Sequence, residues 1–288
     1  MRWQEVHEGT DPHRWRSAPI DARTLTPNLH ALGERAGAFI GAPGYGTIAA
    51  TGPNYISQPG YEEILTGRFS GCDSNHCPRT VLPTLLDEAR AAGAKVAVFA
   101  SWERIDLAST ASPGAFFVSA GRHGDDTIAP WPGVGDYRPD RITSEVALAY
   151  YAKERPDVFY LSLGDPDEHA HHGDYSGYVN ALRRADETLG RLLELVDENT
   201  HVVVTADHGR ADSFADHGSM PEAARVWMAA SGPRFLARGA VTSPHPRRLA
   251  DIAPTLRVVL GLPSDVSTRS GAPIEELFGE GWLASHTP

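Results

Sequence analysis

The sequence contains no long hydrophobic run, and none of its apolar stretches approaches the roughly 18 to 20 residues that span a bilayer. The opening stretch MRWQEVHEGTDPHRW also lacks the apolar segment of a signal peptide. Lys and Arg nowhere gather into a stripe, and the formal net charge is −11, which argues against a nucleic-acid backbone as partner. We therefore expect neither a membrane span nor a nucleic-acid scaffold. Localisation and oligomeric state stay open.

Cysteine is scarce, and no repeat or linker divides the chain. The only two cysteines, Cys72 and Cys77, could close a small loop in an exported protein, whereas in a cytosolic protein they would be two isolated thiols. No internal repeat, low-complexity block or charge run interrupts the 288 residues. The sequence predicts a single domain over residues 1–288, which is long enough to bury a sizeable core.

Apolar runs that alternate with helical patterns define the fold class. Strands are predicted at residues 95–100, 157–163, 201–206 and 225–230, where apolar residues follow one another almost without interruption. Between the second and third of these runs, apolar residues spaced three and four apart over 179–196 indicate an amphipathic helix. Near-continuous apolar strands separated by helices favour an α/β fold, a three-layer α/β/α arrangement around a largely parallel central sheet.

Acidic residues and histidines follow two of the predicted strands. The stretch GDPDEHAHHGDY (164–175) comes after the second strand, TADHGR (205–210) comes after the third, and FADHGSM (214–220) adds another Asp-His pair. Ligands of open α/β sheets bind outside the carboxyl ends of strands. Mixed carboxylate and imidazole ligands suit Zn²⁺, Mn²⁺ or Fe²⁺ better than Ca²⁺ or Mg²⁺. Each motif alone is weak, since a solvated acidic loop is commoner, but the three together predict a metal centre.

Five motifs in order resemble the alkaline phosphatase superfamily, whose two-metal enzymes include nucleotide pyrophosphatase/phosphodiesterases, sulfatases and cofactor-independent phosphoglycerate mutases. The motifs are TPNLHALGERAGAFIG, PNYISQPGYEEILTGR, PDEHAHHG, VVVTADHG and DIAPTLRVVLGLP. The resemblance extends over most of the chain. It implies an alkaline-phosphatase-like fold and two divalent metal ions, with Zn²⁺ favoured and Mn²⁺ second.

The resemblance also implies the metal ligands. They are acidic and histidine side chains of the three clusters: Asp167, His171 and His217 for the first ion, and Asp207 and His208 for the second. A different alignment of the first loop would put His169 or His172 in the place of His171. The remaining acidic residues of that loop, Asp165, Glu168 and Asp174, are then expected to support the ligands or face solvent.

A serine before the second motif's helix matches the position of the family's nucleophile. We expect Ser57 as the helix N-cap, Pro59 in the first turn and helix over 61–66. There, unpaired backbone N–H groups and the helix dipole would favour an incoming phosphate. Ser57 is the nucleophile that the resemblance implies, although a plain capping serine is the alternative. Asn75 resembles the asparagine that holds a substrate oxygen in some relatives, and the alternative is a turn-forming residue.

The family also begins with a core strand that ends in Asp-Gly and supplies a further ligand to the second metal. Here the sequence opens with MRWQEV, which resembles the segment directly after that Asp-Gly. Loss of a central strand would cost many kcal/mol against a stability of roughly 5 to 15 kcal/mol. We therefore expect an upstream segment that encodes the strand, rather than a degenerate protein with a weakened second site. Such a segment would also leave export open.

The resemblance implies hydrolysis of phosphate monoesters or diesters through a phosphoseryl intermediate, with a small phosphorylated molecule as substrate. A phosphomutase is the nearest alternative, favoured by the close spacing of ADHG and DHG, but 288 residues leave no room for the inserted cap domain of that branch. A sulfatase is less expected, because SQPGY lacks the Arg of the Cys/Ser-x-Pro-x-Arg motif. A catalytically silent metal-binding protein is the alternative from another class.

Overall fold

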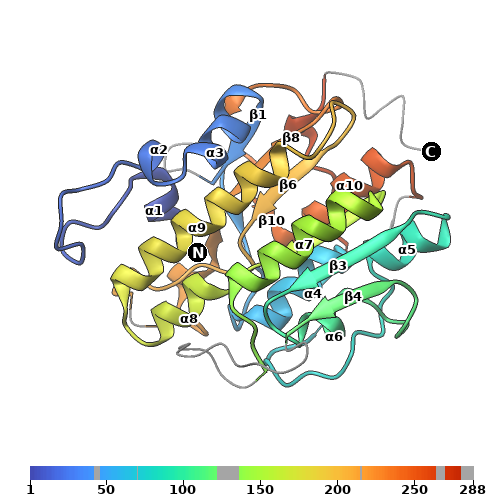
Figure 1. The fold of residues 1–288 in the computed structure, drawn as a ribbon, viewed down its shortest axis with the longest axis horizontal. Coiled ribbons are helices and arrows are strands. Elements are labelled where there is room, and N and C mark those ends of the chain that lie inside the picture. Colours follow the sequence, from blue (N-terminus) through green and yellow to red (C-terminus); the bar gives the residue numbers. More distant parts are fainter. Residues whose placement is uncertain (42–45, 70, 122–135, 215, 264–269, 280–288) are drawn as a thin grey trace.

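The computed structural model describes residues 1–41, 46–69, 71–121, 136–214, 216–263 and 270–279. Its central sheet has two main parts (Figure 1). The first part has the order β4-β3-β5 and is parallel throughout, with β3 (Val96–Ala100), β4 (Phe117–Ala120) and β5 (Val158–Ser162). The second has the order β6-β8-β1-β9, with β6 (Val202–Thr205), β8 (Met228–Ser231), β1 (Gly37–Ile40) and β9 (Gly239–Ala240).

Strand direction differs between the two parts. In the second part β8 runs antiparallel to both β6 and β1, so only β1 and β9 form a parallel pair there. A small third sheet pairs β10 (Arg247–Arg248), β2 (Ile48–Ala49) and β7 (Arg225–Val226). The predicted strand at 225–230 is thus divided between β7 and β8, on either side of the fully buried Trp227.

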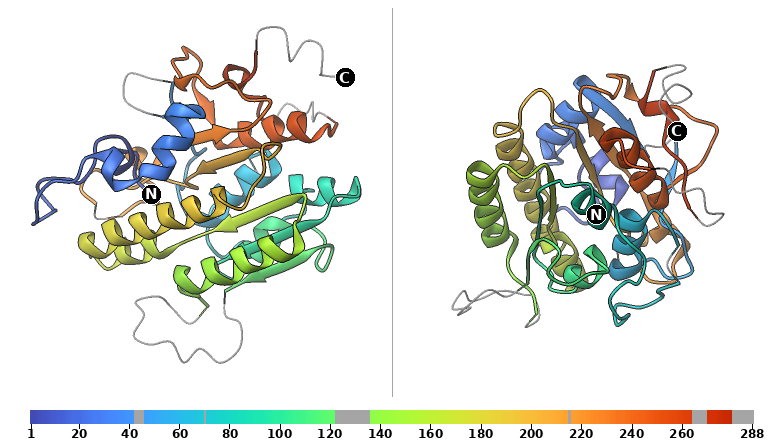
Figure 2. Two further views of the ribbon diagram at one scale, coloured as in Figure 1. Left: turned by 45° about the horizontal axis from the view of Figure 1, so that its top comes forward. Right: turned by 90° about the vertical axis from the view of Figure 1, so that its right-hand side faces the viewer.

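Helices cover both faces of the sheet, which confirms the predicted three-layer arrangement. One face carries α7 (Asp140–Glu154) and α9 (Tyr175–Leu193), and the other carries α4 (Ser57–Thr66), α5 (Leu85–Ala91) and α10 (Ile252–Leu260) (Figure 2, right). The shorter helices are α1 (Trp3–His7), α2 (Ala22–Leu25), α3 (Pro27–His30), α6 (Ile105–Ser109) and α8 (Asp165–His171). A π-helical turn (Ala31–Arg35) and 3₁₀ turns at Pro221–Ala224, Leu249–Asp251 and Glu275–Leu277 complete the described elements.

Local sequence explains the long helix and the central strand. In α9, Asp174 caps the first turn by accepting from the Gly177 N–H. Val179 and Leu182 of the predicted stripe are buried, and its later residues, such as Leu189, are half-buried. Every residue of β3 is buried because ladders flank it on both sides. None of the described helices combines the length and the apolar content that crossing a bilayer requires.

The two parts of the sheet are joined by packing and not by a ladder in the described chain. One hydrophobic core includes Val98 of β3, Phe39 of β1 and Leu86 of α5. The residues of β6 are all half-buried, as are four of the five in β5, in contrast to the buried β3. The free edges of β5 and β6 offer backbone groups to a further strand. A core strand ahead of Met1 therefore stays a prediction.

His7 is a half-buried imidazole at the end of α1. Its ring centroid lies 4.4 Å from that of Phe39, and its Nε2 atom is buried without a hydrogen-bond partner among the described residues. Burial, together with the nearby His30, lowers the pKa of His7 to about 4 from an ordinary value of 6.5. At a pH between the unfolded pKa of 6.5 and the folded pKa of about 4, His7 takes up a proton in the unfolded chain but not in the folded protein. The free energy of unfolding therefore decreases as the pH falls through this range.

We predict that His7→Phe makes the protein less sensitive to acid. Because phenylalanine cannot bind the proton, the variant should lose about 2 kcal/mol less of its unfolding free energy than the wild type between pH 7.5 and pH 5. Urea denaturation at the two pH values measures this difference. The exposed His13 provides the control, since its replacement by alanine should leave the pH dependence unchanged. Equal losses in wild type and His7→Phe would contradict the prediction.

Candidate metal centre

Three segments meet at the carboxyl ends of β5 and β6. Asp167 and His171 belong to α8, which starts three residues after β5, while Asp207 and His208 follow β6 almost directly. The next loop brings back His217, which is buried. All five predicted ligands therefore come to one place, as expected for residues at neighbouring strand ends.

The ligand atoms of these residues lie close together. Asp167, His208 and His217 offer one atom each within 4.8 Å of one another, and His171, Asp216 and His217 form a second such group. Asp167 Oδ2 is 2.9 Å from His171 Nε2 and 3.9 Å from His217 Nε2. The cluster is thus continuous, and the division of its residues between two ions stays a prediction.

Two of the histidines are oriented for metal binding. His208 Nδ1 lies 2.7 Å from the Gly209 carbonyl, and His217 Nδ1 lies 2.8 Å from the Tyr55 carbonyl. A carbonyl oxygen only accepts, so in the neutral form of each ring Nδ1 carries the proton and Nε2 presents a lone pair. Such second contacts fix the tautomer and orientation of ligating histidines.

The aspartates complete a donor set that fits a divalent cation. Asp207 Oδ2 is buried without a hydrogen-bond partner among the described residues, 3.5 Å from His208 Nε2. A buried carboxylate oxygen without a donor is costly, and a cation would remove that cost. Nitrogen and oxygen donors together suit Zn²⁺ or Mn²⁺.

Electrostatics favour the unprotonated forms of two predicted ligands, Asp167 and His217. Burial opposes ionisation of Asp167, but the hydrogen bond from His171 and the nearby His208 keep the pKa of its carboxyl well below the usual value. Burial and His208 lower the pKa of His217 to about 4. At neutral pH His217 is therefore neutral, as metal binding requires. The hydrogen bond to Asp167 raises the pKa of His171 instead.

Ser57 faces this cluster from the other side of the sheet. Its hydroxyl oxygen lies 3.2 Å from His208 Nε2, and it donates there because that nitrogen carries the lone pair. The approach depends on Gly60, where a Cβ atom would lie 2.3 Å from the Asp207 carbonyl oxygen. Only glycine allows the first turn of α4 to come this close to the strand end.

The expectation that Ser57 caps its helix is wrong. Helix α4 begins at Ser57 itself, Ile56 is the N-cap residue, and no side chain of this segment caps the first turn. The cap comes from Asn75, whose Oδ1 accepts from the Gln58 N–H at 2.9 Å. The Gln58 N–H is already bonded to Asn75, and Pro59 has no N–H. The start of α4 therefore has fewer unpaired backbone N–H groups for a phosphate than the sequence predicted.

Asn75 lies in a loop closed by a disulfide between Cys72 and Cys77. The two cysteines thus close a small loop, and localisation stays open. The fully buried Gln58 fixes the loop further, because its side-chain amide donates to the Cys77 carbonyl at 3.0 Å. With Oδ1 of Asn75 bound to the helix, its amide nitrogen remains the group that can donate to a ligand.

The other histidines of the first loop point elsewhere. His169 Nδ1 lies 3.0 Å from Asp174 Oδ2, and His172 Nδ1 lies 2.8 Å from the Glu168 carbonyl. His171 is therefore the histidine of this loop that faces the cluster. Asp165 is buried and accepts from the backbone N–H of Asp140 at 2.9 Å, which anchors the start of α8.

Two residues at the site were not predicted. Arg210 is buried and donates to Asp167 Oδ1 at 2.8 Å, and Asp216 is exposed beside His217. Arg210 lies in the motif TADHGR and Asp216 lies in FADHGSM, so both belong to segments that the sequence had already marked. Nothing in the spacing distinguishes them from solvent-facing charges.

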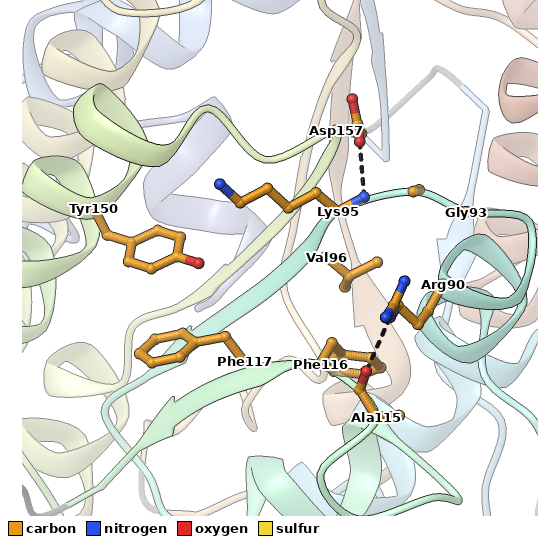
Figure 3. A pocket seen from close by; sticks show the side chains of 10 residues that line it. Arg90, Gly93, Lys95, Val96, Ala115, Phe116, Phe117, Tyr150 and Asp157 are labelled. Carbon is orange, nitrogen blue, oxygen red and sulfur yellow. Dashed lines mark hydrogen bonds between the residues drawn. The ribbon is translucent and has the colours of Figure 1, made fainter.

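A separate hollow lies at the opposite end of β3. Its volume is about 350 Å³, and Lys95, Phe117 and Tyr150 are among the residues that line it (Figure 3). Lys95 Nζ already donates to Glu154. None of the residues predicted for the site lines this hollow, which lies at the amino end of the strand.

Comparisons with known proteins agree with the sequence resemblance. Residues 140–264 match the model of the Metalloenzyme superfamily, which implies divalent metal ions, and this range contains all five predicted ligands. A 2,3-bisphosphoglycerate-independent phosphoglycerate mutase of Desulforudis audaxviator is 34% identical over 145 residues, 48% of this chain and 28% of that protein. The enzyme of the same name from Natronomonas pharaonis is 35% identical over 126 residues, 41% of this chain and 24% of that protein. The matches thus span only about a quarter of these relatives' length.

Solved structures extend the likeness over most of the chain. A 2-O GAG sulfatase superimposes with a TM-score of 0.65 at 13% identity, over 89% of this chain and 70% of that one. The lipoteichoic acid synthase LtaP of Listeria monocytogenes does so with a TM-score of 0.60 at 14% identity, over the same shares. At such identities the likeness concerns the fold alone. Residues 140–264 are therefore similar to the Metalloenzyme superfamily, and the described chain shares the fold of these solved structures.

Proposed function

We propose that the protein is a metal-dependent hydrolase of phosphate monoesters or diesters that works through a phosphoseryl intermediate. The observation that carries the proposal is the contact of the Ser57 hydroxyl with His208, 3.2 Å away, at the edge of the cluster of Asp167, His208 and His217. A hydroxyl held beside predicted metal ligands is the arrangement of an activated nucleophile.

Two divalent ions would occupy the cluster, with Zn²⁺ favoured over Mn²⁺. Asp167, His171 and His217 would hold one ion, and Asp207 and His208 would hold the other. When bound, such ions lower the pKa of a nearby hydroxyl or water and neutralise the charge of a phosphoryl group. Two observations support this assignment: Asp207 Oδ2 has no hydrogen-bond partner among the described residues, and backbone carbonyls hold the Nδ1 atoms of His208 and His217.

The reaction on the chain itself takes place at Ser57. The Ser57 hydroxyl loses its proton to solvent, and its oxygen forms a bond to phosphorus while the bond from phosphorus to the leaving oxygen breaks and that oxygen takes up a proton. Water then hydrolyses the phosphoseryl ester, which releases phosphate and restores the hydroxyl. The Asn75 amide nitrogen would donate to a phosphoryl oxygen, since its Oδ1 is already bound to Gln58. The N-terminal end of α4 adds a favourable dipole for the negative charge.

A phosphomutase is the second candidate, favoured by the similarity of part of this chain to phosphoglycerate mutases. In that case the phosphoryl group would pass from Ser57 to another hydroxyl of the same substrate and not to water. A catalytically silent metal-binding protein is the third candidate. It would bind the ions without forming the phosphoserine.

Ser57→Ala should lower the turnover of a chromogenic phosphate ester by about 10³-fold or more, because it removes the attacking oxygen. The metal content should stay that of the wild type, which elemental mass spectrometry checks. Ser57→Thr keeps a hydroxyl and should retain part of the activity. Turnover unchanged by Ser57→Ala would rule out the covalent route.

We expect about two divalent ions per chain after purification in the presence of Zn²⁺, as in two-metal hydrolases. Asp207→Asn should lower this number to about one, because an amide is a much poorer ligand than a carboxylate. Asp212→Asn, five positions further along the same loop and exposed, is the control and should change nothing. If Asp207→Asn keeps the full metal content, the assignment of Asp207 to the second ion fails.

Hydrolase and mutase differ in where the phosphoryl group goes. In water enriched in heavy oxygen, a hydrolase incorporates one solvent oxygen into each inorganic phosphate it releases, whereas a mutase converts a phosphoglycerate to its isomer without releasing phosphate. Phosphorus NMR separates these products. Metal binding with neither product from an ester or a phosphoglycerate would favour the silent protein.

A further inference from the structure

Arg210 is a buried cation that contacts a predicted metal ligand. It lies three residues after Asp207, its side chain is 3% exposed, and its Nη2 donates to Asp167 Oδ1 at 2.8 Å. Burying a guanidinium is costly unless its charge is compensated. Asp167 supplies that compensation.

The two oxygens of Asp167 face different partners. Oδ1 accepts from Arg210, whereas Oδ2 lies 2.9 Å from His171 Nε2 and 3.9 Å from His217 Nε2. The carboxylate therefore has only one oxygen directed to the imidazole cluster. Rotation about its side-chain bonds would break the contact with Arg210.

An aromatic surface holds the guanidinium in place. Arg210 Cζ lies 5.7 Å from the centroid of the Phe214 ring. Phe214 is itself buried and contacts the rings of Tyr175 and Tyr178 of α9 at centroid distances of 5.1 Å and 5.2 Å. A guanidinium that stacks on a fixed ring loses little further freedom when it binds a carboxylate.

We propose that Arg210 is a positioning residue for the metal centre, and this inference rests on the metal binding of the proposed function. By fixing Oδ1 of Asp167, Arg210 keeps Oδ2 directed at the histidines before any ion arrives. Residues that hold the ligands of a metal typically change its affinity when they are replaced. The positive charge of Arg210 also repels a cation and so opposes metal binding. We expect the positioning of Asp167 to outweigh this repulsion.

The test is a Zn²⁺ titration of metal-free protein in competition with a chromogenic chelator. Arg210→Met removes the charge and the hydrogen bond but keeps an apolar chain over Phe214, and it should weaken Zn²⁺ binding about 10- to 100-fold. Arg210→Lys restores a charge without the planar fork and should recover only part of the affinity. Circular dichroism checks that each variant is folded. If Arg210→Met does not fold, Arg210→Lys is the variant that tests the proposal.

Arg14 provides a matched control. Its Cζ lies 5.6 Å from the same Phe214 ring, but its ion pair is with Asp11 and not with Asp167. Arg14→Met should leave the Zn²⁺ affinity unchanged. An affinity equal to or tighter than wild type in Arg210→Met, or full rescue by Arg210→Lys, would overturn the proposal. Failure of the wild type to bind Zn²⁺ would instead overturn the proposed function, and this inference with it.

Discussion

The negative charge of Asp167 is the constraint around which the site is built. The Asp167 side chain is half-buried, and a carboxylate withdrawn from water is stabilised by donors or cations around it. Here those groups come from three separate places: His171 from its own helix, Arg210 from the loop after β6, and His217 from the loop that follows. The segments meet because one charge requires all of them. These neighbours favour the charged form of Asp167, and the pKa of its carboxyl is therefore low.

The position of Ser57, the proposed nucleophile, depends on a second, steric condition. Gly60 lets the first turn of α4 approach the Asp207 carbonyl, and Asn75 caps that turn through the Gln58 N–H. With the cap supplied from outside the helix, the Ser57 hydroxyl is available to His208. Packing of one glycine and capping by one remote asparagine thus decide whether this serine is structural or reactive.

Local pattern predicted the elements well, and tertiary contacts account for what it missed. Apolar runs gave β3, β5 and β6, and the three- and four-residue spacing gave α9, because burial on one face determines both patterns. The antiparallel direction of β8 was missed, since an apolar run carries no information on strand direction. The meeting of the Asp and His clusters could be predicted from their motifs, but the contacts of Ser57 and Arg210 could not. Their partners, His208 and Asp167, lie 151 and 43 residues away in the sequence.

The proposed metal centre lies where the sheet is interrupted in the described chain, so a bound ion would also have a structural role. In the described chain no ladder joins β5 to β6, yet Asp167 and His171 extend from the β5 side, while Asp207, His208 and His217 extend from the β6 side. A cation bound by residues of both sides would be a cross-link between two separately hydrogen-bonded sheets. Its binding energy would then also be cohesion energy of the protein. The metal centre would therefore stabilise the fold as well as take part in the reaction.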